Sequence, residues 1–388
     1  MQKNTFELEN FSLLGGPLHR VGRRVGLVRG GANTVALGLA VAGFLWGIMV
    51  VLAFIEGISH QLFSLTVIGG HARLLAAIPL LFLCESVFDP RTAAFVQTLV
   101  RSGVVPESAL PVLEAEASRI MRWKDAWLPE TICLLAAVLF SLTGVQVHLS
   151  GATSALDAGH TLSDLTWTAW WYWGVCLTLF RFLMFRWLWR LGLWCFFLWR
   201  ISKLQLDLVP THPDYAAGLG SLEVVQTQFV PLVLALSVVQ SASLAGEISS
   251  GSLAFEAIYP SMAFLLIVNA VLFLGPLFIF APKLWACRLK GLSDYTVLGS
   301  SYVRRFDRKW MGATAPPETE LLGTPDLQSL ADLGNSIEVV RNMRWVPMSL
   351  RLTRDIVIAA LLPMLPLLVL KFPVTELAEK FFTRLVGL

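Results

Sequence analysis

The stretch Ala36–Phe54, ALGLAVAGFLWGIMVVLAF, contains no charged residue. Further along the chain, Ile258–Ala281, IYPSMAFLLIVNAVLFLGPLFIFA, is equally free of charge. A helix rises about 1.5 Å per residue, and a bilayer core about 30 Å thick needs roughly 20 apolar residues to be crossed. Both stretches therefore predict transmembrane helices.

The composition of the whole chain agrees with a membrane protein. Of its 388 residues, 55% are hydrophobic and 15% are charged, whereas a soluble domain carries about 25% charged residues. This shortage of charge argues against a soluble, secreted, fibrous or disordered protein. The net charge of +3 comes from Lys and Arg that flank apolar segments, so the expected partner is the lipid bilayer and not nucleic acid.

Seven apolar segments predict the helices of the bundle. The class that we expect is an all-α integral membrane protein with six or seven transmembrane helices and a helical cytoplasmic layer. The fourth segment supports such a layer, because it continues well past the length that the bilayer needs. The segments cover residues 33–56, 62–88, 127–149, 166–199, 226–247, 256–282 and 355–370.

The distribution of Lys and Arg sets the expected orientation, since cytoplasmic loops carry the excess of positive charge. Basic residues gather in 1–32, 89–126 and 283–354. The connections without Lys or Arg are 57–61, 150–165 and 248–255. We therefore expect a cytoplasmic N-terminus, with the first six segments crossing the membrane back and forth.

Four parts of the chain follow from this pattern. They are a cytoplasmic N-terminal arm (1–32), a six-helix transmembrane bundle (33–282) with cytoplasmic helices in 89–126 and a loop at 200–225, a cytoplasmic helical segment (283–354), and a seventh membrane or re-entrant segment followed by an amphipathic tail (355–388). The seventh segment stays open between spanning and returning, because it is short and contains Pro363 and Pro366.

Ionisable side chains inside the apolar segments are candidates for function, because charge is costly in the hydrocarbon region. Two of these candidates lie at matching depths: Glu85 is fourteen residues after His71, and Arg181 is fourteen after Trp167. Both are thus about 21 Å along helices that run in the same direction. Equal depth predicts an ion pair between Arg181 and Glu85. The full set of candidates for an intramembrane polar path is His71, Arg73, Glu85 and Arg181.

Each of these candidates also has a structural interpretation, and the sequence leaves both open. An Arg181–Glu85 pair is either a gate or anion-binding element in a permeation path, or a pair that holds two helices together; Arg181 alone can also reach the headgroups. His71 and Arg73 either face an outer vestibule or follow the turn at Gly69–Gly70. Three glutamines of the fifth segment either line a pore or bond to a neighbouring helix: Gln226, Gln228 and Gln240.

A loop near the inner ends of the helices contains the motif PTHPD at Pro210–Asp214. Two prolines and a capping carboxylate favour a rigid turn. The alternative is a metal or ligand site, whose candidate residues are Asp207, Thr211, His212 and Asp214. Because no second His or Cys stands at ligand spacing, we expect no metal and no cofactor. The five cysteines lie in apolar stretches and are interpreted as core residues.

Several short motifs, in this order, resemble a family of bacterial polytopic membrane proteins of unassigned function. The motifs are HARLLAAIPLLFLCE (His71–Glu85), LVPTHPDYAAGLG (Leu208–Gly220), YVRRFDRKW (Tyr302–Trp310), LADLGNSIEVVRN (Leu330–Asn342) and the late stretch LLPMLPLLVL. The resemblance implies a location in the bacterial inner membrane but no activity and no site residue. One departure is Ala217, where the family pattern has a glycine, so the backbone of this turn need not follow the family.

Three functional hypotheses remain. The first is a transport protein, expected to be a passive, channel-like oligomer for a small ion, because the chain has charges in its membrane segments but no nucleotide-binding loop. The second is a membrane assembly or sensory component that binds a cytoplasmic partner. The third is an enzyme acting on lipid headgroups beside His212 and Asp214. No catalytic motif is present, so no residue is assigned a catalytic role.

Overall fold

The computed structural model describes residues 11–13, 15, 34–149, 166–311 and 325–367. These parts of the chain form helices, turns and connections, with no β-strand among them. The α-helices are α3 (Thr34–Ile55), α4 (Ser59–Leu62), α5 (Ile68–His71), α6 (Ile78–Arg101), α7 (Leu110–Asp125), α8 (Trp127–Leu149), α9 (Trp167–Trp171), α10 (Leu177–Lys203), α11 (Ser221–Thr227), α12 (Val230–Ser249), α13 (Ile258–Asn269), α14 (Ala281–Trp310), α15 (Pro325–Arg341) and α16 (Leu350–Leu361). Short 3₁₀ turns lie at Leu65–Val67, Glu107–Ala109, Phe255–Ala257, Gly275–Phe280 and Leu362–Met364.

Five continuous helical stretches are long and apolar enough to cross a membrane, which confirms the all-α class and supports a membrane protein. A sixth is added if α7 and α8, which meet at a bend of 44°, are taken as one span. The five stretches are Thr34–Ile55, Leu65–Arg101, Trp167–Lys203, Ser221–Ser249 and Phe255–Trp310.

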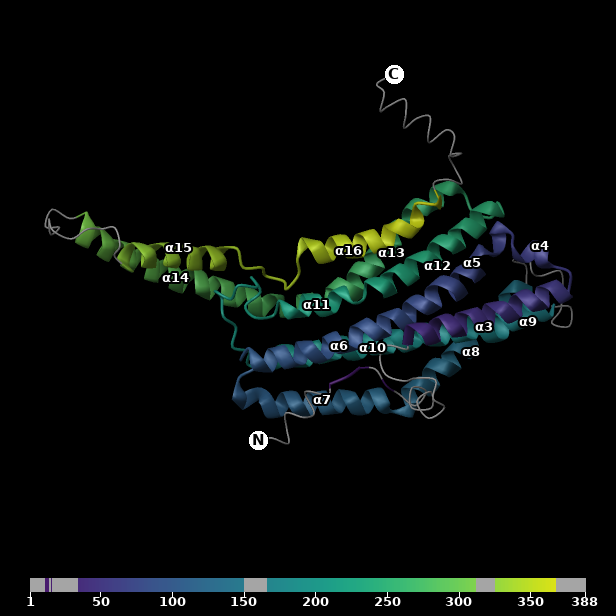
Figure 1. The fold of residues 1–388 in the computed structure, drawn as a ribbon, viewed down its shortest axis with the longest axis horizontal. Helices are drawn as coiled ribbons and strands as arrows, with labels where there is room; N and C mark the ends of the chain where they lie inside the picture. The colour runs from purple at the N-terminus through teal and green to yellow at the C-terminus, as the bar shows by residue number, and fades with distance from the viewer. Residues whose placement is uncertain (1–10, 14, 16–33, 150–165, 312–324, 368–388) are drawn as a thin grey trace, which may run out of the picture.

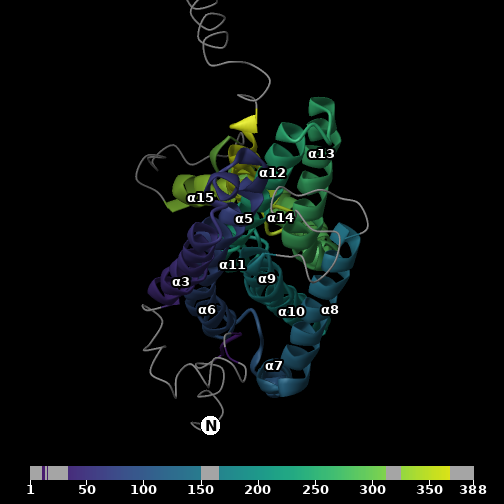
Figure 2. The same ribbon diagram turned by 90° about the vertical axis from the view of Figure 1, so that its right-hand side faces the viewer.

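The long helices run roughly side by side along the longest axis of the molecule (Figure 1). At one end α14 and α15 leave the bundle as a projecting hairpin, and we call this the hairpin end. The opposite end carries the turns at 56–64 and 250–257, and we call it the loop end. Figure 2 views the bundle from the loop end, with α5, α9 and α12 near its middle and α8 at its edge.

The seventh apolar segment runs beside α12 and in the same direction. Ser237 of α12 donates a hydrogen bond to the carbonyl of Ala360, and Ser241, one turn further, donates to that of Pro363 at 2.5 Å. Leu367 then packs in a cluster with Leu244, near the loop end. The segment therefore advances toward the loop end as far as the structure describes it. The expected amphipathic tail lies outside the described residues.

The expected helical layer is present at the hairpin end. Helix α10 continues past the apolar bundle to Lys203 and packs against α7. Phe11 of the N-terminal arm stacks on Phe197 of α10 with ring centroids 4.7 Å apart. Asp89 of α6 accepts hydrogen bonds from Ser12 Oγ at 2.7 Å and from the amide of Leu13 at 3.0 Å. The layer is thus continuous with the bundle.

Candidate functional site

The predicted ion pair between Glu85 and Arg181 is wrong. In the described structure the salt bridges of Glu85 go to Arg190, which is in close contact, and to Arg186 at 3.5 Å. Arg181 instead donates a hydrogen bond to Ser141 Oγ of α8 at 3.0 Å. The carboxylate meets α10 five to nine residues beyond Arg181, which is about 8 to 14 Å along the helix.

The depth estimate fails because His71 and Trp167 do not start at the same level. The amides of Trp167 and Thr168 donate to the carboxylate of Glu56, which lies in the turn that follows α3. His71 lies deeper, and its neighbour Arg73 is level with Tyr172, to which it donates a hydrogen bond. Counting fourteen residues from His71 and fourteen from Trp167 therefore leads to two different depths in the bundle.

The charges around Glu85 form a buried cluster that we call the ion cluster, made of Glu85, Glu130, Arg186 and Arg190. Arg186 Nε lies 3.3 Å from a carboxylate oxygen of Glu130, and its Nη2 donates to the carbonyl of Gly15 at 2.9 Å. Arg190 also lies over the ring of Trp187, 5.4 Å from its centroid. Two carboxylates balance two guanidinium groups, which fits the structural interpretation for Glu85.

Arg73 and Arg181, in contrast, both bind hydroxyl groups within the bundle. Arg73 donates to the phenol oxygen of Tyr172 at 2.9 Å and to Ser243 Oγ of α12 at 3.0 Å. Arg181 lies on α10, nine residues after Tyr172, and donates to Ser141 Oγ of α8. Its partner Ser141 also accepts a hydrogen bond from Thr178 at 2.8 Å. We call this group of two guanidinium groups and their hydroxyl partners the arginine site.

The arginine site lacks a negative charge. Within the described parts of the chain, no carboxylate forms a salt bridge with Arg73 or with Arg181, and their partners are neutral hydroxyls. Both arginines are half-buried in the apolar length of the bundle. A positive charge in a poorly solvated place lowers the free energy of an anion that binds beside it.

The helices that form the arginine site are locally unwound. Arg73 lies in the π-helical segment Ala72–Ala77, and Tyr172 opens a second π-helical segment, Tyr172–Cys176. Such wide turns are rare, and they often occur at functional positions. The two π-helical segments meet at the hydrogen bond between Arg73 and Tyr172, which hydropathy and residue spacing did not reveal. The sequence analysis also missed Tyr172, Ser243 and Ser141, whose only signal is a polar group in an apolar segment.

His71 does not face an open vestibule. Its Nδ1 accepts a hydrogen bond from Trp46 Nε1 at 2.9 Å, and its Nε2 lies 2.8 Å from the carbonyl of Leu62. The ring of Phe63 stacks on that of His71 with centroids 5.8 Å apart. His71 therefore ties α3, the turn at Leu62 and α5 together.

The PTHPD loop has the structure of a rigid turn. The carboxylate of Asp214 accepts hydrogen bonds from the amides of Ala216 at 2.8 Å, Gly218 at 3.1 Å and Gly220 at 2.7 Å. These bonds overcome the effect of burial, which alone raises the pKa of an aspartate, and they hold the pKa of Asp214 below its usual value. His212 Nδ1 is 2.8 Å from the same carboxylate.

Other residues of the predicted loop site are dispersed. The amide of Asp207 donates to the carbonyl of Val104 at 2.8 Å, while its side chain is exposed. Thr211 is half-buried at the start of the turn. Over the described residues, no group of three or more His, Cys, Asp and Glu side chains is arranged to hold a metal ion. Asp207, Thr211, His212 and Asp214 thus do not converge on a common ligand position.

The loop is braced by Arg344, a residue that the sequence analysis did not single out. Its Nη2 donates to the carbonyl of Asp214 at 2.7 Å, and its Nη1 donates to Glu223 at 2.9 Å. Glu223 also accepts a hydrogen bond from Ser349, the N-cap residue of α16. The PTHPD loop therefore joins α11 to the start of α16.

Comparison with known proteins adds no relative. No protein-family model, curated protein or solved structure matches the chain. The functional argument accordingly depends on the geometry of the arginine site and of the surfaces at the hairpin end.

Proposed function

We propose that this chain is a membrane transport protein whose substrate is a small anion, and that Arg73 and Arg181 attract and hold this anion within the bundle. The observation that carries the proposal is that both guanidinium groups lie in the apolar length of the bundle, bind neutral hydroxyls and have no carboxylate partner among the described residues. A positive site in a medium of low dielectric raises the local concentration of anions. Passive transport is proposed because the sequence has no nucleotide-binding loop.

We place the protein, as part of this proposal, in the bacterial inner membrane, with the N-terminus and the hairpin end in the cytoplasm. The support for this placement is the excess of Lys and Arg in the connections at the hairpin end and their complete absence from 57–61 and 248–255 at the loop end. Membership of the bacterial family that the motifs resemble is part of the same proposal. Assembly into an oligomer also belongs to this proposal.

The test is anion flux from liposomes that contain the purified full-length chain. Chloride or nitrate efflux is measured for the unchanged protein and for Arg181→Gln and Arg181→Lys. We expect Arg181→Gln to reduce the flux by about tenfold or more, and Arg181→Lys to retain much of it, because the charge remains. If Arg181 served only to pack the helices, Arg181→Lys would not retain more flux than Arg181→Gln.

Lys309→Gln is the matched control. Lys309 is also a cation, but it lies near the tip of the hairpin and pairs with Asp326 at 2.5 Å. Its replacement should leave the flux unchanged. Efflux of K⁺ as fast as that of chloride, or no efflux of any anion from correctly inserted protein, would refute anion transport.

A second function, binding of a cytoplasmic partner, is favoured by the hairpin of α14 and α15. The two helices touch each other through Gly299, whose Cα lies against Ile337, and through Tyr302, which donates to the carbonyl of Asp326 at 3.0 Å. Beyond these contacts most side chains of the hairpin are exposed, among them the apolar Val297 and Leu298. Loss of a co-purifying protein on deletion of the hairpin tip, with anion flux intact, would support this function.

The third hypothesis, a lipid enzyme, loses its candidate base, because the carboxylate of Asp214 accepts hydrogen bonds from backbone amides.

A further inference from the structure

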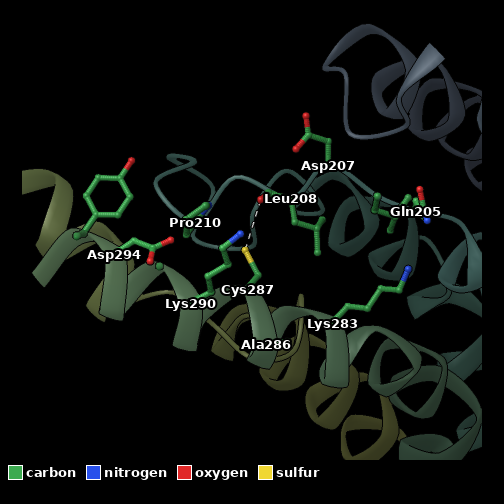
Figure 3. Close-up of a pocket in the computed structure, with 12 residues that line it drawn as sticks. Gln205, Asp207, Leu208, Pro210, Lys283, Ala286, Cys287, Lys290 and Asp294 are labelled. Atoms are coloured by element: carbon green, nitrogen blue, oxygen red, sulfur yellow. Dashed lines mark hydrogen bonds between the residues drawn. The ribbon is translucent and has the colours of Figure 1, made fainter. Parts of the chain in front are cut away.

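A cavity of about 600 Å³ lies at the hairpin end, between the segment 205–210 and the first four turns of α14 (Figure 3). It is open to one side and lies just past the uncharged stretch that ends at Ala281. The membrane boundary is therefore expected at this level of α14. The charged side chains in its wall are Asp207, Lys283, Lys290 and Asp294.

Positive charge is unpaired on the bundle side of this cavity. Lys283 donates to the carbonyl of Leu204, which follows Lys203 in the chain and precedes the wall residue Gln205. No carboxylate forms a salt bridge with Lys203, Lys283 or Lys290 in the described structure. Lys203 and Lys290 are exposed, while Lys283 is half-buried.

The two acidic residues of the wall do not neutralise these lysines. Figure 3 shows the carboxylate of Asp207 directed away from α14. Asp294 lies one turn beyond Lys290 toward the hairpin tip, and the two form no salt bridge in the described part of the chain. The lysines nearest the bundle thus remain available to a ligand.

Exposed tryptophans lie within about one turn of these lysines along α10 and α14. Lys203 Nζ lies 5.6 Å from the ring centroid of Trp199, and the guanidinium of Arg288 lies 5.9 Å from that of Trp285. Both tryptophans are exposed by more than 40%. Exposed Trp beside Lys and Arg is typical of the region where a bilayer meets water, with the ring at the headgroup level. Acyl chains can therefore lie along these helices while a headgroup reaches the cavity.

We propose that this cavity binds the phosphate of an anionic phospholipid, held by Lys283 and Lys290 of its wall and attracted by Lys203, which ends α10 two residues before the wall residue Gln205. The ammonium groups supply the charge and up to three donors each, and the half-open shape admits a headgroup from the side of the bilayer. Because α10 contributes Lys203 and α14 contributes Lys283 and Lys290, the bound lipid links the bundle to the base of the hairpin. The site is independent of the arginine site.

The experiment is a lipid titration of the full-length chain in detergent, followed by native mass spectrometry. Phosphatidylglycerol and phosphatidylcholine with identical acyl chains are compared, with the double variant Lys203→Gln/Lys290→Gln and with Lys309→Gln as the control. The two replaced lysines are exposed, and Lys283 is left in place because its hydrogen bond to Leu204 supports the fold. A thermal unfolding curve without lipid confirms that the double variant is folded.

We expect the first phosphatidylglycerol to bind more tightly than phosphatidylcholine, whose quaternary ammonium is repelled by the lysines. The double variant should weaken this binding by about tenfold, and the control should not change it. Equal affinity for the two lipids, or an unchanged affinity in the double variant, overturns the proposal. Displacement of the lipid by millimolar inorganic phosphate also overturns it, because the site would then serve a free anion.

Discussion

Glu85 of α6 pairs with Arg190 of α10 across the centre of the helix interface, and less than one tenth of either side chain is exposed. The same carboxylate reaches Arg186 one turn earlier on α10. A charge buried at this level is tolerated only where its partner is in contact. The pair therefore fixes the register of α6 against α10.

Replacing Glu85 by Gln should destabilise the protein strongly. Two guanidinium groups would lose a shared counter-charge inside the bundle, and breaking a buried pair from one side costs about 3–5 kcal/mol. The double variant Glu85→Gln/Arg190→Met should cost less than the sum of the two single variants, by about 1 kcal/mol or more, because the first change has already removed the interaction. Thermal unfolding in detergent measures all three.

The matched cycle uses Arg181, the partner that the depth estimate named. The effects of Glu85→Gln and Arg181→Met should add within about 0.5 kcal/mol, because the two side chains share no partner. Coupling in this cycle, together with additivity in the cycle of Glu85 with Arg190, would show that α10 is shifted relative to α6.

This contrast shows what sequence reasoning could reach. It identified Glu85 and Arg181 as side chains that need partners, because the cost of charge in an apolar segment does not depend on the fold. It could not identify the partners, because one helical turn changes every contact and no pattern in the sequence sets the level at which a helix begins. Glu56 sets that level for α9 by accepting hydrogen bonds from Trp167 and Thr168, and it lies more than a hundred residues away.

Gln226 is predicted to be a structural residue. Its side chain is fully buried and accepts a hydrogen bond from Trp194 Nε1 at 3.2 Å. Its amide donates to the carbonyl of Phe273, which lies in the π-helical segment Ala270–Leu274. Of the two interpretations that the sequence left open, bonding to neighbouring helices applies here.

Gln226→Leu should therefore lower the free energy of unfolding by about 1–3 kcal/mol for each group that it leaves unpaired. Gln228→Leu is the control, since Gln228 is partly exposed and donates only to Val224 of its own turn at 3.0 Å. Its effect should stay within about 0.5 kcal/mol. Equal effects in chemical or thermal unfolding would contradict the assigned role of Gln226.

The stability of the PTHPD loop should depend on pH through Asp214. Burial alone would raise the pKa of this carboxyl, but the amides of Ala216, Gly218 and Gly220 and the side chain of His212 outweigh it, so the folded pKa is below that of the unfolded chain. A lowered pKa contributes stability above the unfolded value, about 3.9 for an aspartate, and this contribution is lost as the pH falls through the folded value.

Asp214→Asn should accordingly melt at a lower temperature than the unchanged protein between pH 5 and 8, where the carboxylate is ionised in both states (about 1 pH unit or more above 3.9). The difference should shrink as the pH is taken below about 4. Melting curves at four pH values check this, with Asp207→Asn as the control because that side chain is exposed. A difference that is constant down to pH 3 would mean that the amides do not bind the charged form.

The same loop gives the last prediction, at Ala217. Ala217 has φ +53°, in the left-handed region that L-residues other than Asn and Asp avoid at a cost of about 1–2 kcal/mol, and its methyl group is buried. The alanine thus keeps the backbone that a glycine would adopt freely. Ala217→Gly relieves this cost but loses one buried methyl group, worth about 0.8 kcal/mol, and adds flexibility to the unfolded chain, worth about 0.5–1 kcal/mol.

We therefore expect Ala217→Gly to leave the melting temperature nearly unchanged. Ala216→Gly is the matched control, because Ala216 is also buried but has no positive φ. That change only removes a buried methyl group and adds flexibility to the unfolded chain, so it should cost about 1 kcal/mol or more. If the two substitutions destabilise the protein equally, the backbone of the loop is not left-handed at Ala217, and the hydrogen bonds from Gly218 and Gly220 to Asp214 would need a different turn.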